Sequence, residues 1–147
     1  MAMDQRYTKL GAALTDLDVA WRDRLDDALA LLNAGRHASA ILMGLYALEI
    51  NLKARICRRL DLQHLPRAFE VHDLEGLLLL AGLSKRLSAK RAQKTLDQWD
   101  SIVEKSARLN ELRYAPASRW TAIEAQTFFT QLNQDPDGVL PWLQRQK

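Results

Sequence analysis

The chain has 147 residues, of which 48% are hydrophobic and 27% are charged, with only 6 glycines and 4 prolines. This length and composition are typical of one globular domain and exclude a largely disordered or fibrous chain. The net charge of +3 permits an anionic partner without requiring one, because 21 basic residues nearly balance 18 acidic ones.

The chain contains a single cysteine, Cys57, so no intrachain disulfide can form, and no Cys/His cluster has zinc spacing. The N-terminal residues include no apolar stretch of signal-peptide length, and no apolar stretch is long enough to span a bilayer. We therefore expect one cytoplasmic domain over 1–147, with a core at about 14–133 and a tail at 134–147. We expect no membrane contact, metal or cofactor.

The first two helices are indicated by their apolar residues. These recur every three or four positions over 14–32, and Gly35 follows as a stop signal. A second helix is predicted over 38–60, and its first half is apolar almost all round, which indicates a central helix. Gly44 weakens this helix by up to about 1 kcal/mol relative to alanine, and a close approach of another helix would offset that loss.

Three further helices follow a connector at 61–71, which contains Pro66 and shows no clear period. A short leucine-rich helix is expected over 74–81 and ends at a glycine. A long helix is expected over 88–112, and a fifth helix over 122–132.

The fifth helix begins with the capping-box pattern Thr121-x-x-Glu124, and a turn at 135–138 ends it. The tail with Trp142 is expected to pack back on the bundle. No strand-like alternation is found. The sequence therefore predicts an all-α fold, an up-and-down bundle of about five helices.

Glu49 lies on the most apolar helix, where a carboxylate needs a hydrogen-bond donor. Lys53 is one turn away and is the favoured partner, with Arg113 as a further candidate. Asp73 is expected to cap the helix at 74–81, and we assign it to a structural polar core with Glu49 and Lys53. His72 either packs locally or serves as an acid or base, although no neighbour in sequence orients its ring.

Basic residues form two groups along the chain. The group at the end of the second helix complements the helix dipole and is expected to be a solvated face: Lys53, Arg55, Arg58 and Arg59. The stretch 83–96 contains no acidic residue, and its basic residues are Lys85, Arg86, Lys90, Arg91 and Lys94. This second group favours contact with phosphates, with plain solvation as the alternative.

Three stretches carry a family pattern: AGRHASAILMGLYALEINLKARI at 34–56, VHDLEGLLLLAGL at 71–83 and LNELRY at 109–114. They supply a small-residue helix with a Glu and a Leu-Lys pair, a His-Asp-Leu helix start and an Arg-Tyr junction. Together they resemble HEPN domains, helical domains of prokaryotic toxin–antitoxin and defence systems that also accompany minimal nucleotidyltransferases. The resemblance covers about 14–133 and implies a HEPN-like bundle that forms a homodimer.

In the nuclease members of that family, an Arg-x4–6-His motif from two protomers forms a metal-independent RNA-cleaving site at the dimer interface. Arg113 matches the arginine, but the histidine positions hold Ser118, Arg119 and Trp120. Cleavage needs proton transfer, which histidine does well near neutral pH and serine or arginine does poorly. Arginine side chains can still hold a phosphate through charge-assisted bonds.

Three functions follow as hypotheses. The leading one is a non-catalytic HEPN-like module that dimerises and binds RNA or a nucleotide, or docks a nucleotidyltransferase-type protein partner in a toxin–antitoxin or defence system. The second is a variant ribonuclease toxin in which folding or dimerisation brings His72 near Arg113. The third is a scaffold that binds only protein. The expected RNA- or nucleotide-binding residues are Arg113, Tyr114, Arg119, Lys85, Arg86, Lys90 and Arg91.

Overall fold

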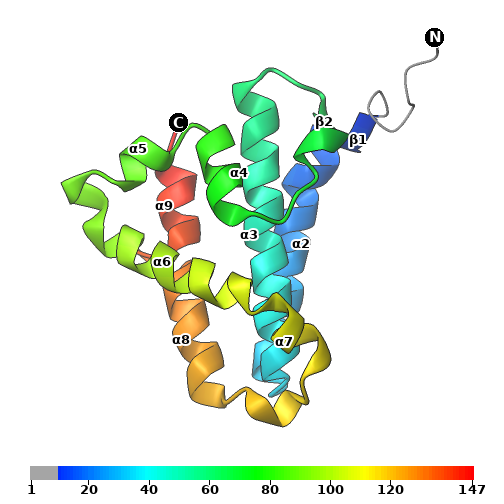
Figure 1. Cartoon of the computed structure of the whole chain (residues 1–147), viewed down its shortest axis with the longest axis vertical. Helices are drawn as coiled ribbons and strands as arrows, with labels where there is room; N and C mark the ends of the chain where they lie inside the picture. Colours follow the sequence, from blue (N-terminus) through cyan, green and yellow to red (C-terminus); the bar gives the residue numbers. More distant parts are fainter. Residues whose placement is uncertain (1–9) are drawn as a thin grey trace.

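The computed structural model describes residues 10–147, an all-α helical bundle with one short pair of strands (Figure 1). Residues 1–9, on which the expectation of no signal peptide rests, lie outside the described part. In chain order the elements, with η marking 3-10 helices, are β1 (Leu10–Ala13), α2 (Leu14–Asn33), α3 (His37–Arg59), β2 (His64–Pro66), η1 (Arg67–Phe69), α4 (Leu74–Leu80), α5 (Ser84–Leu87), η2 (Lys90–Ala92), α6 (Gln93–Ala107), α7 (Leu109–Tyr114), η3 (Ala117–Arg119), α8 (Ala122–Asn133) and α9 (Val139–Arg145).

Helices α2 and α3 form a hairpin and lie side by side along the long axis of the molecule (Figure 1). Helix α2 ends where the backbone N–H of Ala34 bonds to the carbonyl of Ala30 at 3.0 Å. Gly35 then takes a φ of +75°, a conformation that only glycine adopts at little cost. The predicted stop signal is therefore confirmed.

Helix α3 is the central element, because it packs against α2, α4, α7, α8 and β2. Fourteen of its 23 residues are buried, and they lie on all sides of the helix. The prediction of a central helix is confirmed. The main cluster of buried apolar side chains draws on every helix from α2 to α9.

Gly44 allows α8 to approach α3 closely. A Cβ atom at this position would lie 2.6 Å from Cε1 of Phe128 and 3.2 Å from Cδ2 of Leu132. Phe128 is only 1% exposed, and its ring packs edge-on against Phe129 with centroids 5.2 Å apart. The low helix propensity of glycine is offset by a contact that a larger residue would prevent.

Residues 61–71, predicted to be an irregular connector, contain the strand β2. It pairs antiparallel with β1, with Ala13 opposite His64. Leu65 is 1% exposed and lies in a small apolar cluster with residues of α2 and α3. The expectation of no strand was wrong because strands of four and three residues are too short to show alternation.

The long helix predicted over 88–112 is divided. The first part of this range holds the 3-10 helix η2, and the α-helix α6 begins only at Gln93. Helix α6 ends at Ala107, and α7 follows after Arg108. The backbone of Arg108 leaves helical geometry. Its guanidinium donates to the Glu111 carboxylate at 2.9 and 3.0 Å and lies 4.7 Å from the centre of the Trp120 ring. The chain turns around this tryptophan, which residue spacing along one helix does not reveal.

The capping box of α8 forms as predicted. The Thr121 hydroxyl accepts from the backbone N–H of Glu124, and the Glu124 carboxylate accepts from the backbone N–H of Thr121, both at 3.1 Å. The box satisfies backbone donors at the start of the helix that would otherwise lack partners.

The tail packs back on the bundle, as predicted, and it forms a helix. Helix α9 places Leu143 and Trp142 at 0% and 8% exposure within the main apolar cluster. Arg55 of α3 donates to the backbone carbonyls of Leu143 and Gln146, the latter at 3.3 Å, and so holds the end of α9. No helix within residues 10–147 has the length and apolar character that crossing a membrane requires.

Gly44→Ala is expected to lower the free energy of unfolding by about 1–2 kcal/mol, because overpacking against Phe128 outweighs the gain in helix propensity. Urea denaturation measures the change. In a Phe128→Leu background the same substitution should cost less, since the clashing ring atoms are gone. An increase in stability on Gly44→Ala in the wild-type background would contradict the close approach of α8.

Candidate functional site

One face of α3 carries three polar side chains in a row. Tyr46, Glu49 and Lys53 are spaced by three and four residues and therefore project from the same side of the helix. Glu49 and Lys53 are buried, at 8% and 9% exposure, and Tyr46 is half-buried. Helices α4 and α7 pack against α3, so residues of both reach this face.

The Glu49 carboxylate has two partners at one oxygen. Its Oε1 accepts from Nζ of Lys53 at 2.6 Å and lies 2.9 Å from Nδ1 of His72. A carboxylate removed from water needs such partners to stay ionised. The predicted pair of Glu49 with Lys53 forms, and His72 is an addition that comes from 23 residues further along the chain.

His72 stands in the loop that leads into α4. Its side chain is 65% exposed although Nδ1 touches the buried carboxylate, so the rest of the ring faces solvent. A carboxylate at one ring nitrogen fixes the orientation of an imidazole and leaves the other nitrogen available. Glu49 is thus the orienting partner that the local sequence does not supply.

Arg113, at the end of α7, bonds to Tyr46 rather than to Glu49. Its Nη2 donates to the Tyr46 hydroxyl at 3.2 Å. This hydrogen bond raises the pKa of Arg113 above its usual value, and the negative charge of Glu49 acts in the same direction. The Arg113 guanidinium therefore stays charged beside the polar face of α3 while remaining exposed to solvent.

The neighbours of Arg113 point outward. Tyr114 is 81% exposed, and Arg119 of η3 is also exposed. Trp120 is only 3% exposed and packs beneath Lys105 and Arg108, 5.2 and 4.7 Å from its ring centre. One of the three positions where the family motif would place a histidine is therefore a core residue.

Asp73 differs from expectation. It occupies the N-cap position of α4, and its backbone carbonyl accepts from Leu77 at 2.9 Å, but its side chain makes no capping bond. The side chain is exposed rather than part of a polar core. Glu49 and Lys53 form that core without it, because they lie on the buried helix while Asp73 ends a surface loop.

The predicted phosphate-binding residues fall into two separate groups. Lys85, Arg86, Lys90 and Arg91 are exposed on α5 and η2, before α6, whereas α7 and η3 follow α6 (Figure 1). The 15 residues of α6 place about 22 Å between its ends. A ligand held by Arg113 therefore does not reach α5 unless it is extended.

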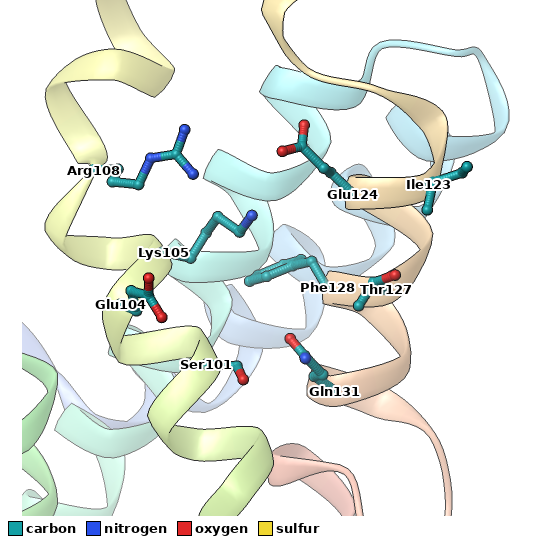
Figure 2. A pocket seen from close by; sticks show the side chains of 9 residues that line it. All are labelled: Ser101, Glu104, Lys105, Arg108, Ile123, Glu124, Thr127, Phe128 and Gln131. Carbon is teal, nitrogen blue, oxygen red and sulfur yellow. The ribbon is translucent and has the colours of Figure 1, made fainter.

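A pocket of about 250 Å³ lies between α6 and α8 (Figure 2). Lys105 of α6 and Arg108, which directly follows this helix, extend toward α8, and Glu124 extends back toward them. Glu104 adds a second acidic side chain, so the charges of the lining balance. None of the residues predicted to bind or react lines this pocket, and we assign it no role.

Within residues 10–147, no group of three or more His, Cys, Asp or Glu side chains is placed to hold a metal ion. Comparison with known proteins finds no family model, no curated protein and no solved structure that matches the chain. The likeness to HEPN domains therefore rests on the three sequence stretches alone.

Lys53→Met is expected to lower the free energy of unfolding by about 3 kcal/mol, because it leaves the buried carboxylate without its cation. The matched control is Arg24→Ala, which breaks an exposed pair with Asp27 and should cost less than about 1 kcal/mol. The double variant Glu49→Gln with Lys53→Met should be more stable than Lys53→Met alone. Equal losses for Lys53→Met and Arg24→Ala would contradict the burial of the pair.

Proposed function

We propose that this chain is a cytoplasmic, non-catalytic HEPN-like module that dimerises and binds RNA or a nucleotide at the surface around Arg113. The observation that carries the proposal is the bond between Arg113 and Tyr46, which holds a charged, exposed guanidinium beside the outward-facing ring of Tyr114. Guanidinium groups bind phosphate oxygens, and exposed aromatic rings stack on unpaired bases.

Arg119, at the end of η3, is a second exposed arginine that follows Arg113 and Tyr114 in the chain. The histidine that cleavage needs is absent at 118–120, where Trp120 is buried. These features favour holding a phosphate over cleaving a bond to it. Dimerisation, a nucleotidyltransferase-type partner and a toxin–antitoxin or defence setting are implied by the family resemblance alone, and a protein-only scaffold is the outcome if no ligand binds.

Arg113→Ala is expected to weaken binding of a short single-stranded RNA by roughly ten- to hundredfold, the typical contribution of a hydrogen bond to a charged group. Fluorescence anisotropy with labelled RNA measures the affinity at two salt concentrations, and the salt dependence should fall with the lost phosphate contact.

Lys94→Ala is the matched control, because it removes one exposed positive charge at the opposite end of α6. It should change affinity by less than twofold. Equal losses for Arg113→Ala and Lys94→Ala would mean that net charge, not the α7 surface, attracts RNA. Absence of any RNA or nucleotide binding by the wild type would exclude the proposed ligand class.

A second candidate function, a variant ribonuclease, is favoured by the contact between Glu49 and His72. If Nδ1 is the nitrogen that donates to Glu49, Nε2 is left as the acceptor of the neutral ring. In cleavage this nitrogen would take the proton of a ribose 2′-hydroxyl while the 2′-oxygen bonds to phosphorus. The bond from phosphorus to the 5′-oxygen then breaks, and that oxygen takes up the proton that the His72 ring accepted. Arg113 would stabilise the charged phosphate.

If this second function operates, purified protein cleaves RNA in the presence of EDTA, and both His72→Ala and Arg113→Ala reduce the rate at least a hundredfold, the usual contribution of acid–base catalysis. His37→Ala controls for the loss of a histidine elsewhere on α3. Gel analysis of a mixed RNA substrate measures the rate. If the wild-type protein leaves the RNA intact, the ribonuclease function is excluded and only the binding function stands.

A further inference from the structure

A concave basic site lies at the C-terminal end of α3, away from the Arg113 surface. A pocket of about 440 Å³ is bounded by the last turn of α3, the turn between α4 and α5, and the end of α9. Four arginines line it: Arg55, Arg58, Arg59 and Arg86. We name it the arginine pocket. Among the described residues, none that lines it carries a carboxylate side chain.

The pocket is assembled from segments far apart in sequence. Gly82, with a φ of +77°, terminates α4, and a Cβ atom there would lie 2.6 Å from Nε of Arg59. The absence of that side chain allows the Arg59 guanidinium to lie against the backbone, where its Nη1 donates to the Leu80 carbonyl at 2.7 Å. Arg86 closes another side and donates through Nη1 to the backbone oxygen of Lys147 at 3.2 Å.

Positive charge in the pocket is only partly compensated. Arg58 pairs with Asp18 of α2, which does not line the pocket. Arg55 is half-buried, and its donors are used by Asn51 and by backbone carbonyls of α9. Burial, followed by the charge of Arg58, lowers the pKa of Arg55 to about 10. A bound anion would relieve the repulsion between the Arg55 and Arg58 guanidinium groups.

The donors of Arg55 are taken up in holding the end of α9, but Arg59 and Arg86 keep donors that have no partner among the described residues. A guanidinium has five N–H donors, and among residues 10–147 Arg59 and Arg86 each make one side-chain hydrogen bond. Both side chains are exposed at the mouth of the pocket, so their remaining donors face the open volume or solvent. Donors of this kind suit the oxygens of a phosphate, which accept paired hydrogen bonds.

We propose that the arginine pocket binds a compact phosphate group with more than one negative charge, such as the diphosphate of a small molecule. A volume of about 440 Å³ lies within the range of small-molecule sites. A phosphodiester strand fits less well, because it carries one charge per phosphate along an extended path. This site is separate from the Arg113 surface, so it stands or falls independently of the proposed function.

Isothermal titration calorimetry at low salt tests the pocket with inorganic pyrophosphate and with ADP. The variant Arg59→Gln with Arg86→Gln changes two exposed side chains and should weaken pyrophosphate binding roughly tenfold or more, since each loses charge-assisted bonds. The matched control, Arg36→Gln with Arg67→Gln, removes the same charge from exposed positions outside the pocket. The control should change the affinity for pyrophosphate by less than twofold, whereas a loss of affinity on Arg113→Ala and not in the pocket variant would place the anion at the Arg113 surface and overturn the proposal.

Equal affinities for pyrophosphate and ADP would identify the phosphate group alone as the feature recognised. Tighter binding of ADP that is lost in the Arg59→Gln with Arg86→Gln variant would identify a nucleotide as its source. Either result supports the proposal. It is overturned if neither compound binds the wild-type protein, if the control variant loses as much affinity as the pocket variant, or if only single-stranded RNA binds there.

Discussion

The structure depends on one constraint, which is that α3 is packed on all sides yet carries polar side chains. Glu49, Asn51 and Lys53 have little access to water and need partners within the fold. Glu49 takes Lys53 and His72, and Asn51 accepts from Arg55. The bond to His72 ties the loop before α4 to α3. Arg55, which donates to Asn51 within α3, also donates to backbone carbonyls at the end of α9 and so ties that helix to α3.

The sequence predicts those parts of the fold that depend on local signals. The bounds of α2, α3, α4 and α8 follow from apolar spacing, from Gly35 and Gly82, and from the capping box at Thr121. The parts it misses depend on contacts between distant segments. The strand pair is too short to show a period, and α6 ends where Arg108 packs over the ring of Trp120. Apolar residues in the tail predict that it packs back on the bundle, but they do not predict that it forms the helix α9.

The same division applies to the polar sites. Glu49 and Lys53 are four residues apart, so helical geometry predicts their contact. The partners of His72, Arg113 and Arg55 lie 23, 67 and up to 91 residues away, and no spacing rule connects them. The arginines that end α3 illustrate the difference. Helix-dipole reasoning assigns them to solvent, whereas the fold brings a turn and a second helix end against them and makes a concavity.

The burial of α9 has a consequence for how the protein is made. Translation delivers α6 and α8 before α9, so the apolar surfaces of α6 and α8 that α9 covers stay open until α9 has left the ribosome. A nascent chain in this state exposes apolar surface, which promotes aggregation and is the kind of surface that chaperones bind.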